Sequence, residues 1–493
     1  MLKSARPLVA TAAALSLLLA APAALAVPIP PGPGDPLVPD YTGRPAQPDP
    51  VQGFDVPRHP FMAPNGSSNM HNDAYSTDAY ETRGPLGRDP QVTTATYGVQ
   101  ECATQTFDRA GRIVALCGGL ADRQLKLIDP DTLDVLAVHD LPRPEVRPGQ
   151  SPLTDLCGGA YFYLDEADRA VVATTDRRIE VLGQQPGGGF SEQRSYDLNG
   201  QIGGQDCLVA LMPDWSGTVW FVTGEGVVGT LDRESGAIRT ANLPGERIAN
   251  SFAVDETGGV FVVSDHANYR FDSGPDGAPV ITWRQAYDRG TRTKPGQLSQ
   301  GSGTTPTLLG DDLVAITDNA EPRMRVLVYR RSSGEFVCGR EVLQPGASAT
   351  ENTLVAAGNS VIVENNYGYT GPQATMLGAS TEPGIEKVDI AGGECSTAWR
   401  NDEVAPSSVP KASLESGLLY VYSKPPDRRG VPAWYFTAID LHTGETVNRT
   451  LTGTGLQWNN HYAPIYLGPD GTAYLAGIAG MMRIADAERP PGR

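Results

Sequence analysis

The chain of 493 residues lacks most of the short motifs by which enzymes and metal proteins are recognised. It has no Cys-x-x-Cys pair, no Gly-x-Ser-x-Gly elbow, no phosphate-binding loop and no His-Glu-x-x-His sequence. These absences argue against zinc knuckles, dithiol redox sites, elbow-type hydrolases, P-loop enzymes and zinc peptidases. Basic residues are also few, since 39 Lys and Arg stand against 57 Asp and Glu, a formal net charge of -18. Such a charge repels nucleic acid and anionic membranes, so neither is an expected partner, and it attracts cations.

Long apolar runs are missing beyond the N-terminus, so no membrane span is expected. The N-terminus itself combines Lys3 and Arg6 with an apolar stretch over residues 8–21 and the small-residue sequence Ala24-Leu25-Ala26. This pattern is typical of a secretion signal, which we predict over residues 1–26. The protein is therefore expected to be secreted, either to the extracellular medium or to the cell-wall space.

Long helical periodicity is missing as well, whereas Gly (56) and Pro (41) are abundant. This composition favours many short strands and turns. Residues 466–476 show two short apolar runs around Gly468-Pro469-Asp470-Gly471, which indicates a β-hairpin. Similar hairpins recur with a mean spacing of about 52 residues. Their turns fall at Asp108, Asp165, Asp214, Asp255, Gly310, Gly358, Ser416 and Asp470.

Each hairpin is followed by a second pair of strands with its own turn, most clearly at residues 438–445. A four-stranded unit cannot bury its two faces alone, whereas radial stacking of such units buries both. The last unit stops near residue 486, one strand short, and residues 92–97 could supply that strand. The sequence thus predicts an all-β fold: a single β-propeller over residues 91–486 with eight four-stranded blades, closed by an N-terminal strand. Seven blades are the alternative.

The remaining segments are expected to lie outside the blades. Residues 27–58 are dense in Pro and Gly and predict an extended leader. Residues 59–90 are polar, aromatic and rich in amides, so we expect an ordered loop over the propeller face. Residues 487–493 form a short C-terminal tail.

Ala438, Asp440, Thr443 and Gly444 form an Ala-x-Asp-x-x-Thr-Gly pattern that resembles the blade motif of the quinoprotein-type (PQQ-like) propellers. The resemblance implies eight blades. That family's motif ends in a tryptophan that docks neighbouring blades, and Asn448 stands in its place here. Its quinone enzymes also carry a disulfide between adjacent cysteines, and this chain has no Cys-Cys pair. The resemblance therefore supports the fold and argues against a quinone-dependent oxidoreductase.

The six cysteines all follow the predicted signal, and an even number in an exported chain indicates disulfides. If Arg109 and Ala110 form a two-residue turn, opposed residue numbers sum to 219, which sets Cys102 opposite Cys117. The other four occupy matching places in successive repeats, two at first-strand starts and two in outer strands. We predict the pairs Cys102–Cys117, Cys157–Cys207 and Cys338–Cys395.

Carboxylate and amide side chains recur where first strands start and second strands end. Because these strands are antiparallel, both positions lie at one mouth of the central channel. Calcium binds six to eight oxygen ligands of this kind. The alternative is that these residues cap turns and bond nearby backbone. The predicted calcium ligands are Glu101, Asp206, Asn250, Asn319, Glu351 and Asn460.

Two loops combine amides with aromatic rings, as small-molecule pockets do. The alternative is loop packing between blades. Histidines near the same face are candidate general bases, although loop histidines are often only solvated. The predicted ligand-binding residues are Asn365, Asn366, Tyr367, Trp458, Asn459 and Asn460, and the candidate bases are His71, His266 and His461.

These features favour an exported binding or scaffold propeller with a polar, cation-binding central face. Its partner would be a small molecule, a glycan or a protein. The alternative is a calcium-dependent hydrolase or lyase that resembles lactonase and arylesterase propellers. Those enzymes usually have six blades, which counts against this alternative.

Overall fold

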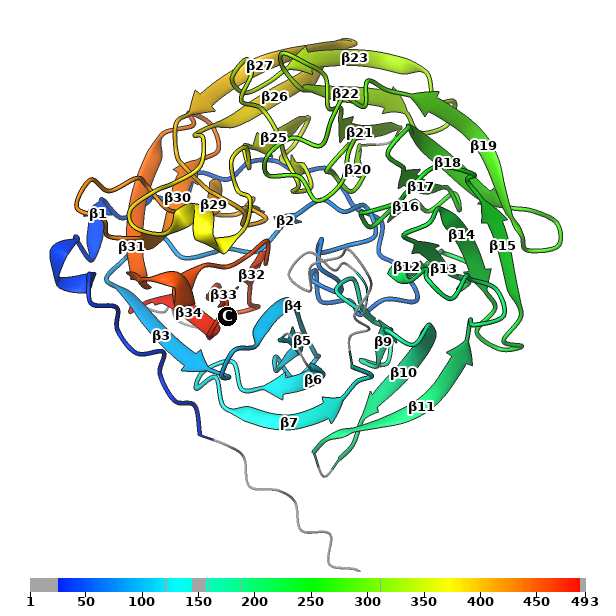
Figure 1. The fold of residues 1–493 in the computed structure, drawn as a ribbon, viewed down its shortest axis with the longest axis horizontal. Coiled ribbons are helices and arrows are strands. Elements are labelled where there is room, and N and C mark those ends of the chain that lie inside the picture. Colours follow the sequence, from blue (N-terminus) through cyan, green and yellow to red (C-terminus); the bar gives the residue numbers. More distant parts are fainter. Residues whose placement is uncertain are drawn as a thin grey trace, which may run out of the picture.

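The computed structural model describes residues 25–119, 122–143, 157, 159–186, 188–310 and 312–487. Eight antiparallel four-stranded blades surround a central channel, with first strands near the axis and fourth strands at the rim (Figure 1). The predicted eight-bladed propeller is confirmed, and the alternative of seven blades is wrong. Most of the predicted signal and all of the tail beyond residue 487 lie outside the described residues.

Blades 1 to 4 follow one another in chain order. Their strands are β4 (Glu101–Phe107), β5 (Ile113–Gly118), β6 (Arg123–Ile128) and β7 (Val135–Asp140); β8 (Tyr163–Leu164), β9 (Ala170–Ala173), β10 (Arg178–Gln184) and β11 (Phe190–Asp197); β12 (Leu208–Pro213), β13 (Val219–Thr223), β14 (Val227–Leu231) and β15 (Ile238–Asn242); β16 (Ala253–Val254), β17 (Val260–Val263), β18 (Ala267–Ser273) and β19 (Pro279–Ala286).

Blades 5 to 8 complete the ring, and three 3-10 turns lie in the leader and in loops. The strands are β20 (Thr307–Leu309), β21 (Leu313–Thr317), β22 (Arg325–Arg330) and β23 (Phe336–Glu341); β24 (Val355–Ala356), β25 (Ser360–Glu364), β26 (Ile385–Ala391) and β27 (Glu394–Asn401); β28 (Lys411–Ser413), β29 (Leu418–Ser423), β30 (Ala433–Asp440) and β31 (Thr446–Thr454); β32 (Ile465–Leu467), β33 (Ala473–Gly477) and β34 (Gly480–Asp486). The 3-10 turns are η1 (Asp35–Leu37), η2 (Pro372–Thr375) and η3 (Leu456–Trp458).

The ring closes through β3 (Pro90–Thr96), which is the fourth strand of blade 8. Pro90 pairs with Asp486 and Thr96 with Gly480 along an antiparallel ladder. The predicted closure by an N-terminal strand is confirmed. It joins strands from the two ends of the propeller region in one sheet, which fastens the ring as a whole.

Aspartates close several inner turns. Asp108 Oδ1 accepts the backbone N–H groups of Ala110 and Arg112, both at 2.9 Å. Asp165, Asp214 and Asp255 form the same pair of bonds in their own turns. A short carboxylate side chain can reach these N–H groups, which explains why the turn signal was readable from the sequence.

The expected two-residue turn in blade 1 is wrong, although the disulfide derived from it is present. The backbone N–H of Asp108 donates to Arg112, so the loop has three residues and opposed numbers sum to 220. A register shift between Glu101 and Thr104 restores the pairing of Glu101 with Gly118. This bulge brings Cys102 to face Cys117, with 3.8 Å between their Cα atoms.

The other predicted disulfides are confirmed as well. Cys157 bonds Cys207, which connects the approach to blade 2 with blade 3. Cys338 of β23 bonds Cys395 of β27, which connects the outer strands of blades 5 and 6. Two of the three disulfides therefore hold neighbouring blades together.

Two tryptophans dock blades onto their neighbours. Trp399 of β27 packs against Gly444 in the outer turn of blade 7 and donates its indole N–H to the Leu441 carbonyl at 3.0 Å. Trp283 of β19 makes the same contact with blade 5, against Gly334. Docking by tryptophan thus occurs in this ring, in blades other than the one that carries Asn448.

The leader runs along the rim, where β1 (Tyr41–Gly43) extends the outer edge of blade 7. The chain then crosses the channel, and we call residues 61–86 the channel segment (Figure 1). Its backbone carbonyls accept N–H groups from the first strands of several blades, for example Ala74 from Val254, Tyr75 from Leu308 and Asp78 from Ala412. Within it, β2 (Ala79–Tyr80) pairs in parallel with β28. The expected ordered loop is therefore a cross-link at the axis of the ring.

Within the described part of the chain, no helix has the length and apolar character needed to span a membrane.

Candidate binding cavity

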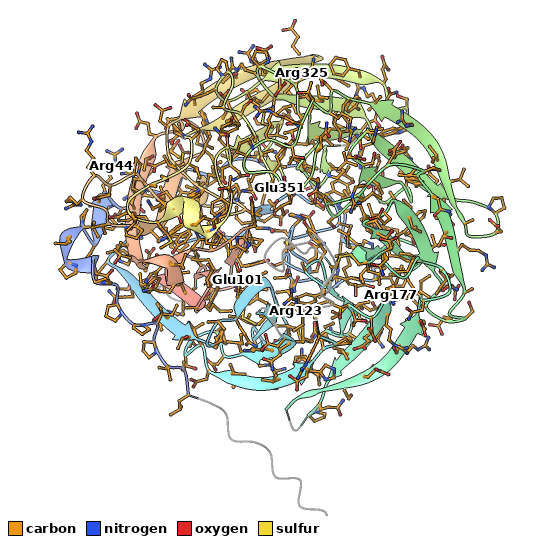
Figure 2. All side chains as sticks on the ribbon, in the orientation of Figure 1. Arg44, Glu101, Arg123, Arg177, Arg325 and Glu351 are labelled. Atoms are coloured by element: carbon orange, nitrogen blue, oxygen red, sulfur yellow. A yellow bond between two sulfur atoms is a disulfide. The ribbon has the colours of Figure 1, made fainter. Side chains whose placement is uncertain are left out.

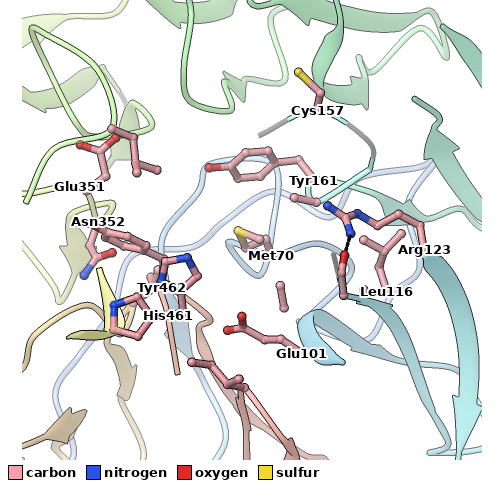
Figure 3. Close-up of a pocket in the computed structure, with 18 of the residues that line it drawn as sticks. Met70, Glu101, Leu116, Arg123, Cys157, Tyr161, Glu351, Asn352, His461 and Tyr462 are labelled. Atoms are coloured by element: carbon pink, nitrogen blue, oxygen red, sulfur yellow. Dashed lines mark hydrogen bonds between the residues drawn. The ribbon is translucent and has the colours of Figure 1, made fainter. Parts of the chain in front are cut away.

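A cavity of about 720 Å³ lies at the end of the channel where the first strands begin. Glu101, Asn250, Glu351 and His461 contribute to it from positions at or just before the first strands of four blades. The channel segment contributes Met70 and His71, and we call this part of the lining the cavity floor. Figure 3 labels Met70 there, between Glu101 and Tyr161. Figure 2 shows Glu101 and Glu351 near the ring axis, whereas Arg44 and Arg325 lie at the rim.

Much of the cavity wall is apolar. Two tyrosines add aromatic surface, and polar side chains are interspersed with the apolar ones, a combination found in small-molecule sites. The apolar and aromatic lining residues include Leu116, Tyr161, Leu298, Met376, Leu456, Tyr462 and Ile478.

Glu351 is the most unusual polar group of this wall. The residue is 9% exposed, and neither carboxylate oxygen has a hydrogen-bond partner among the described residues. Burial raises the pKa of its carboxyl well above the ordinary value. The backbone N–H of Leu298 approaches closely enough to oppose this shift, without the distance and angle of a hydrogen bond. Asn366 fixes its backbone, since the Glu351 N–H donates to Asn366 Oδ1 at 2.8 Å. The residue is thus held in place by its backbone, while its carboxyl oxygens accept no hydrogen bond of ordinary geometry from the described residues.

Glu101 is a half-buried residue that places a second carboxyl on a different side of the cavity (Figure 3). Burial raises its pKa well above the ordinary value, and the charge of Arg123 opposes this shift. Its Oε1 atom is buried without a hydrogen-bond partner in the described ranges. Arg123 also lines the cavity and donates to the carbonyl oxygens of Gly119 and Asp122 at 2.6 and 2.9 Å.

His71 lies on the cavity floor next to a buried ion pair. Its Nδ1 atom is 3.1 Å from Asp78 Oδ2, and Asp78 also pairs with Lys411. Lys411 Nζ donates in addition to the Met70 carbonyl at 2.6 Å and to Asn72 Oδ1 at 2.7 Å. Burial lowers the pKa of Lys411, and the carboxylate of Asp78 opposes this shift.

The other two candidate bases differ in position. His461 lines the cavity, with Nδ1 3.1 Å from the Tyr369 hydroxyl and its backbone N–H donating to Asn459 Oδ1 at 2.9 Å. His266 does not line the cavity; its Nδ1 atom is 2.8 Å from Asp265 Oδ1, and the side chain is about one-third exposed. The structure thus brings His71 and His461 to one cavity and leaves His266 outside it.

The six predicted calcium ligands divide into two groups. Three of them, Glu101, Asn250 and Glu351, line the cavity. The others serve their own loops: Asp206 Oδ1 accepts backbone N–H groups, and Asn319 and Asn460 donate to backbone carbonyls. Over the described ranges, no group of three or more His, Cys, Asp or Glu side chains is placed to hold a metal ion. A calcium site stays a prediction.

The predicted ligand-binding residues are not among the residues that line the cavity. Asn366 supports Glu351, Asn459 supports His461, and the Asn365 side chain donates to two backbone carbonyls. Trp458 packs against Gly453. These contacts are of the kind expected from loop packing. The full predicted set is Asn365, Asn366, Tyr367, Trp458, Asn459 and Asn460.

Sequence reasoning missed several residues that the structure places in or under the cavity. Tyr161 precedes a strand of only two residues, so its register could not be read. Arg123 starts a second-pair strand and nevertheless lines the cavity. Lys411 did leave a signal, since it is a lysine within the buried first strand of its blade.

No protein-family model matches the chain. An uncharacterized protein of Archaeoglobus fulgidus is 27% identical over 321 residues, which are 57% of this chain and 61% of that protein. The chain thus covers less than two thirds of this relative's length.

Solved structures show the likeness in fold. Quinohemoprotein alcohol dehydrogenase from Comamonas testosteroni matches with a TM-score of 0.55 at 13% identity, over 87% of this chain and 82% of that one. BamB from Moraxella catarrhalis matches with a TM-score of 0.48 at 12% identity, over 82% of this chain and 100% of that one. The fold is that of the quinoprotein-type propellers. At this identity the likeness concerns the fold alone.

Proposed function

We propose that this chain is an exported binding propeller whose central cavity holds a small organic molecule with a cationic group. The observation that carries the proposal is Glu351, a buried carboxyl whose two oxygens have no hydrogen-bond partner in the described structure. Burying a polar group without a partner costs free energy. A ligand ammonium would supply the missing partner and favour the ionised carboxylate.

The surroundings of Glu351 suit an organic cation. Tyr161 and Tyr462 lie near it (Figure 3). Burial raises the pKa of both hydroxyls, and an ionised Glu351 would raise it further. Aromatic faces attract cations, most strongly where water is excluded. The apolar wall formed by residues such as Leu298 and Met376 would accept the hydrocarbon part of the ligand.

Calcium is the second candidate ligand, supported by the position of Glu101, Asn250 and Glu351 on the same cavity. Calcium requires six to eight oxygens, whereas an ammonium group needs one carboxylate and a few acceptors. Glu101 and Glu351 lie on different sides of the cavity (Figure 3). This separation favours the organic cation.

Export is supported by the three disulfides, which pair all six cysteines. Disulfides persist mainly in oxidising compartments outside the cytosol. This agrees with the secretion signal predicted over residues 1–26.

The test is a binding measurement with matched probes. Phenethylamine carries an ammonium group at neutral pH, and phenethyl alcohol is its neutral counterpart. We expect the amine to raise the unfolding midpoint and the alcohol to leave it unchanged. Equal effects of the two probes, or none, would contradict the proposal.

Two matched variants test whether the ligand cation binds at Glu351. Glu351→Gln is expected to weaken amine binding about tenfold or more, because it removes the charge of the hydrogen-bond acceptor. The control is Glu180→Gln, a buried carboxyl of β10 that lies away from the cavity and whose pKa is also raised by burial. Glu180→Gln should bind as the wild type does.

A further inference from the structure

The cavity floor carries a second arrangement, in which a hydroxyl, an imidazole and a carboxylate follow one another. Thr353 Oγ1 is 3.3 Å from His71 Nε2, and His71 Nδ1 is 3.1 Å from Asp78 Oδ2. Thr353 and His71 both line the cavity. We propose that these residues form a hydrolytic site for an ester or lactone, with the Thr353 hydroxyl as the nucleophile. The proposal uses the same cavity but does not depend on an organic cation.

Asp78 sets the state of the imidazole. A ring that donates its Nδ1–H to a carboxylate presents Nε2 as a proton acceptor. Nε2 lies 3.3 Å from two hydroxyls, those of Thr353 and Thr305. Thr305 is not among the residues that line the cavity. Thr353 is therefore the hydroxyl that a substrate in the cavity can reach.

The imidazole is not needed to fasten the channel segment. The first strands of several blades already hold this segment through backbone hydrogen bonds, from Val254 and Leu308 among others. Lys411 adds bonds to Met70 and Asn72, on both sides of His71. His71 thus stands in a fixed position with its Nε2 atom turned toward the cavity wall, which is the preorganised placement that a general base requires.

The chemistry needs only the substrate and water. Thr353 Oγ1 forms a bond to the carbonyl carbon while its proton passes to His71 Nε2. The bond between that carbon and the leaving alcohol oxygen then breaks, and the proton on Nε2 passes to this oxygen. Water attacks the resulting threonine ester by the same route, which releases the acid and restores the hydroxyl. No oxidant or reductant takes part.

Covalent labelling tests the nucleophile directly. Diisopropyl fluorophosphate transfers its phosphoryl group to an activated hydroxyl, with fluoride as the leaving group. We expect one adduct per chain, located at Thr353 by peptide mass analysis, and turnover of p-nitrophenyl acetate that this adduct abolishes. An adduct at Thr305 instead, or no adduct on either threonine, would overturn the assignment.

Variants separate chemistry from folding. Thr353→Val is expected to lower p-nitrophenyl acetate turnover about 100-fold or more, and Thr353→Ser to restore it. The control is Thr307→Val on β20, a buried threonine whose hydroxyl donates to the Leu354 carbonyl at 3.0 Å. If Thr353→Val and the wild type are both fully folded and turn over the ester equally fast, the site is refuted. Because labelling involves no amine, its outcome is independent of the amine-binding result.

Discussion

Lys411 and Asp78 form an ion pair in which both side chains are fully shielded from solvent. The pair joins the first strand of blade 7 to the channel segment, and Lys411 also bonds the carbonyl of Met70, which lines the cavity. Removing one partner of a buried pair leaves the other charge without compensation. Lys411→Met should therefore lower the free energy of unfolding by about 3–5 kcal/mol.

Urea denaturation measures this loss. Lys387→Met, at a partly buried lysine of β26 that donates to the Leu441 carbonyl, is the matched control and should cost about 1 kcal/mol. The double variant Lys411→Met with Asp78→Asn should regain part of the loss, since it leaves no unpaired charge. A loss below 1 kcal/mol in Lys411→Met would show that the pair does not hold the segment.

The raised pKa of Glu351 predicts a dependence of stability on pH. The folded state keeps the proton on this carboxyl, whereas the unfolded chain releases it near an ordinary pKa of about 4.3. Its favourable contribution is therefore complete below about pH 4.3 and is lost as the pH rises toward the folded pKa. Gln does not ionise, so Glu351→Gln does not lose this stability as the pH rises. In the ligand-free protein, the stability of the variant relative to the wild type should therefore be about 1–3 kcal/mol higher at pH 8 than at pH 4. Urea denaturation of both proteins at the two pH values checks the difference. The same effect at pH 4 and pH 8 would contradict the burial of an unpaired carboxyl.

Tryptophan docking predicts that two similar glycines respond differently. Gly444 and Gly392 both have left-handed backbone, with φ of 76° and 61°. An added Cβ at Gly444 would lie 2.6 Å from the Trp399 ring, whereas at Gly392 it would meet no described atom within 4 Å. Both alanine variants lose about 1 kcal/mol from backbone strain, and Gly444→Ala should lose about 1–3 kcal/mol more. Thermal unfolding of the two variants gives the difference in stability directly. Equal losses would mean that the Trp399 ring moves aside with no loss of stability.

Metal content separates the two candidate ligands. The separate positions of Glu101 and Glu351 lead us to expect that chelation leaves the unfolding midpoint unchanged. Elemental analysis of the purified protein, with thermal unfolding before and after chelation, measures both quantities. A stoichiometric calcium with a lower midpoint after chelation would support the calcium site and call for a screen of lactone substrates.

The fold was predictable because its signals are local. Asp108 and its counterparts bond backbone groups two and four residues ahead, so each turn could be read from a few residues. Ring closure followed from counting strands, and β3 supplies the missing one. The blade 1 disulfide shows the limit of this reasoning, because a bulge compensated for a turn with one residue more than expected.

The cavity was predictable only in part, because its residues are chosen by contacts that are distant in sequence. Asn250 and Asn460 both precede a first strand by a few residues, yet one lines the cavity and the other bonds its own loop. Their local sequences do not distinguish these roles. The path of the channel segment depends on backbone bonds to several blades, so the position of His71 could not be derived from its neighbours.

The most direct test of the account is calorimetric titration of phenethylamine into the wild-type protein, Glu351→Gln and Glu180→Gln. The account predicts one binding site per chain in the wild type and in Glu180→Gln, with affinity about tenfold weaker or lost in Glu351→Gln. Absence of binding to the wild type, or equal affinity in Glu351→Gln, would contradict the assignment of Glu351 as the partner of a ligand cation.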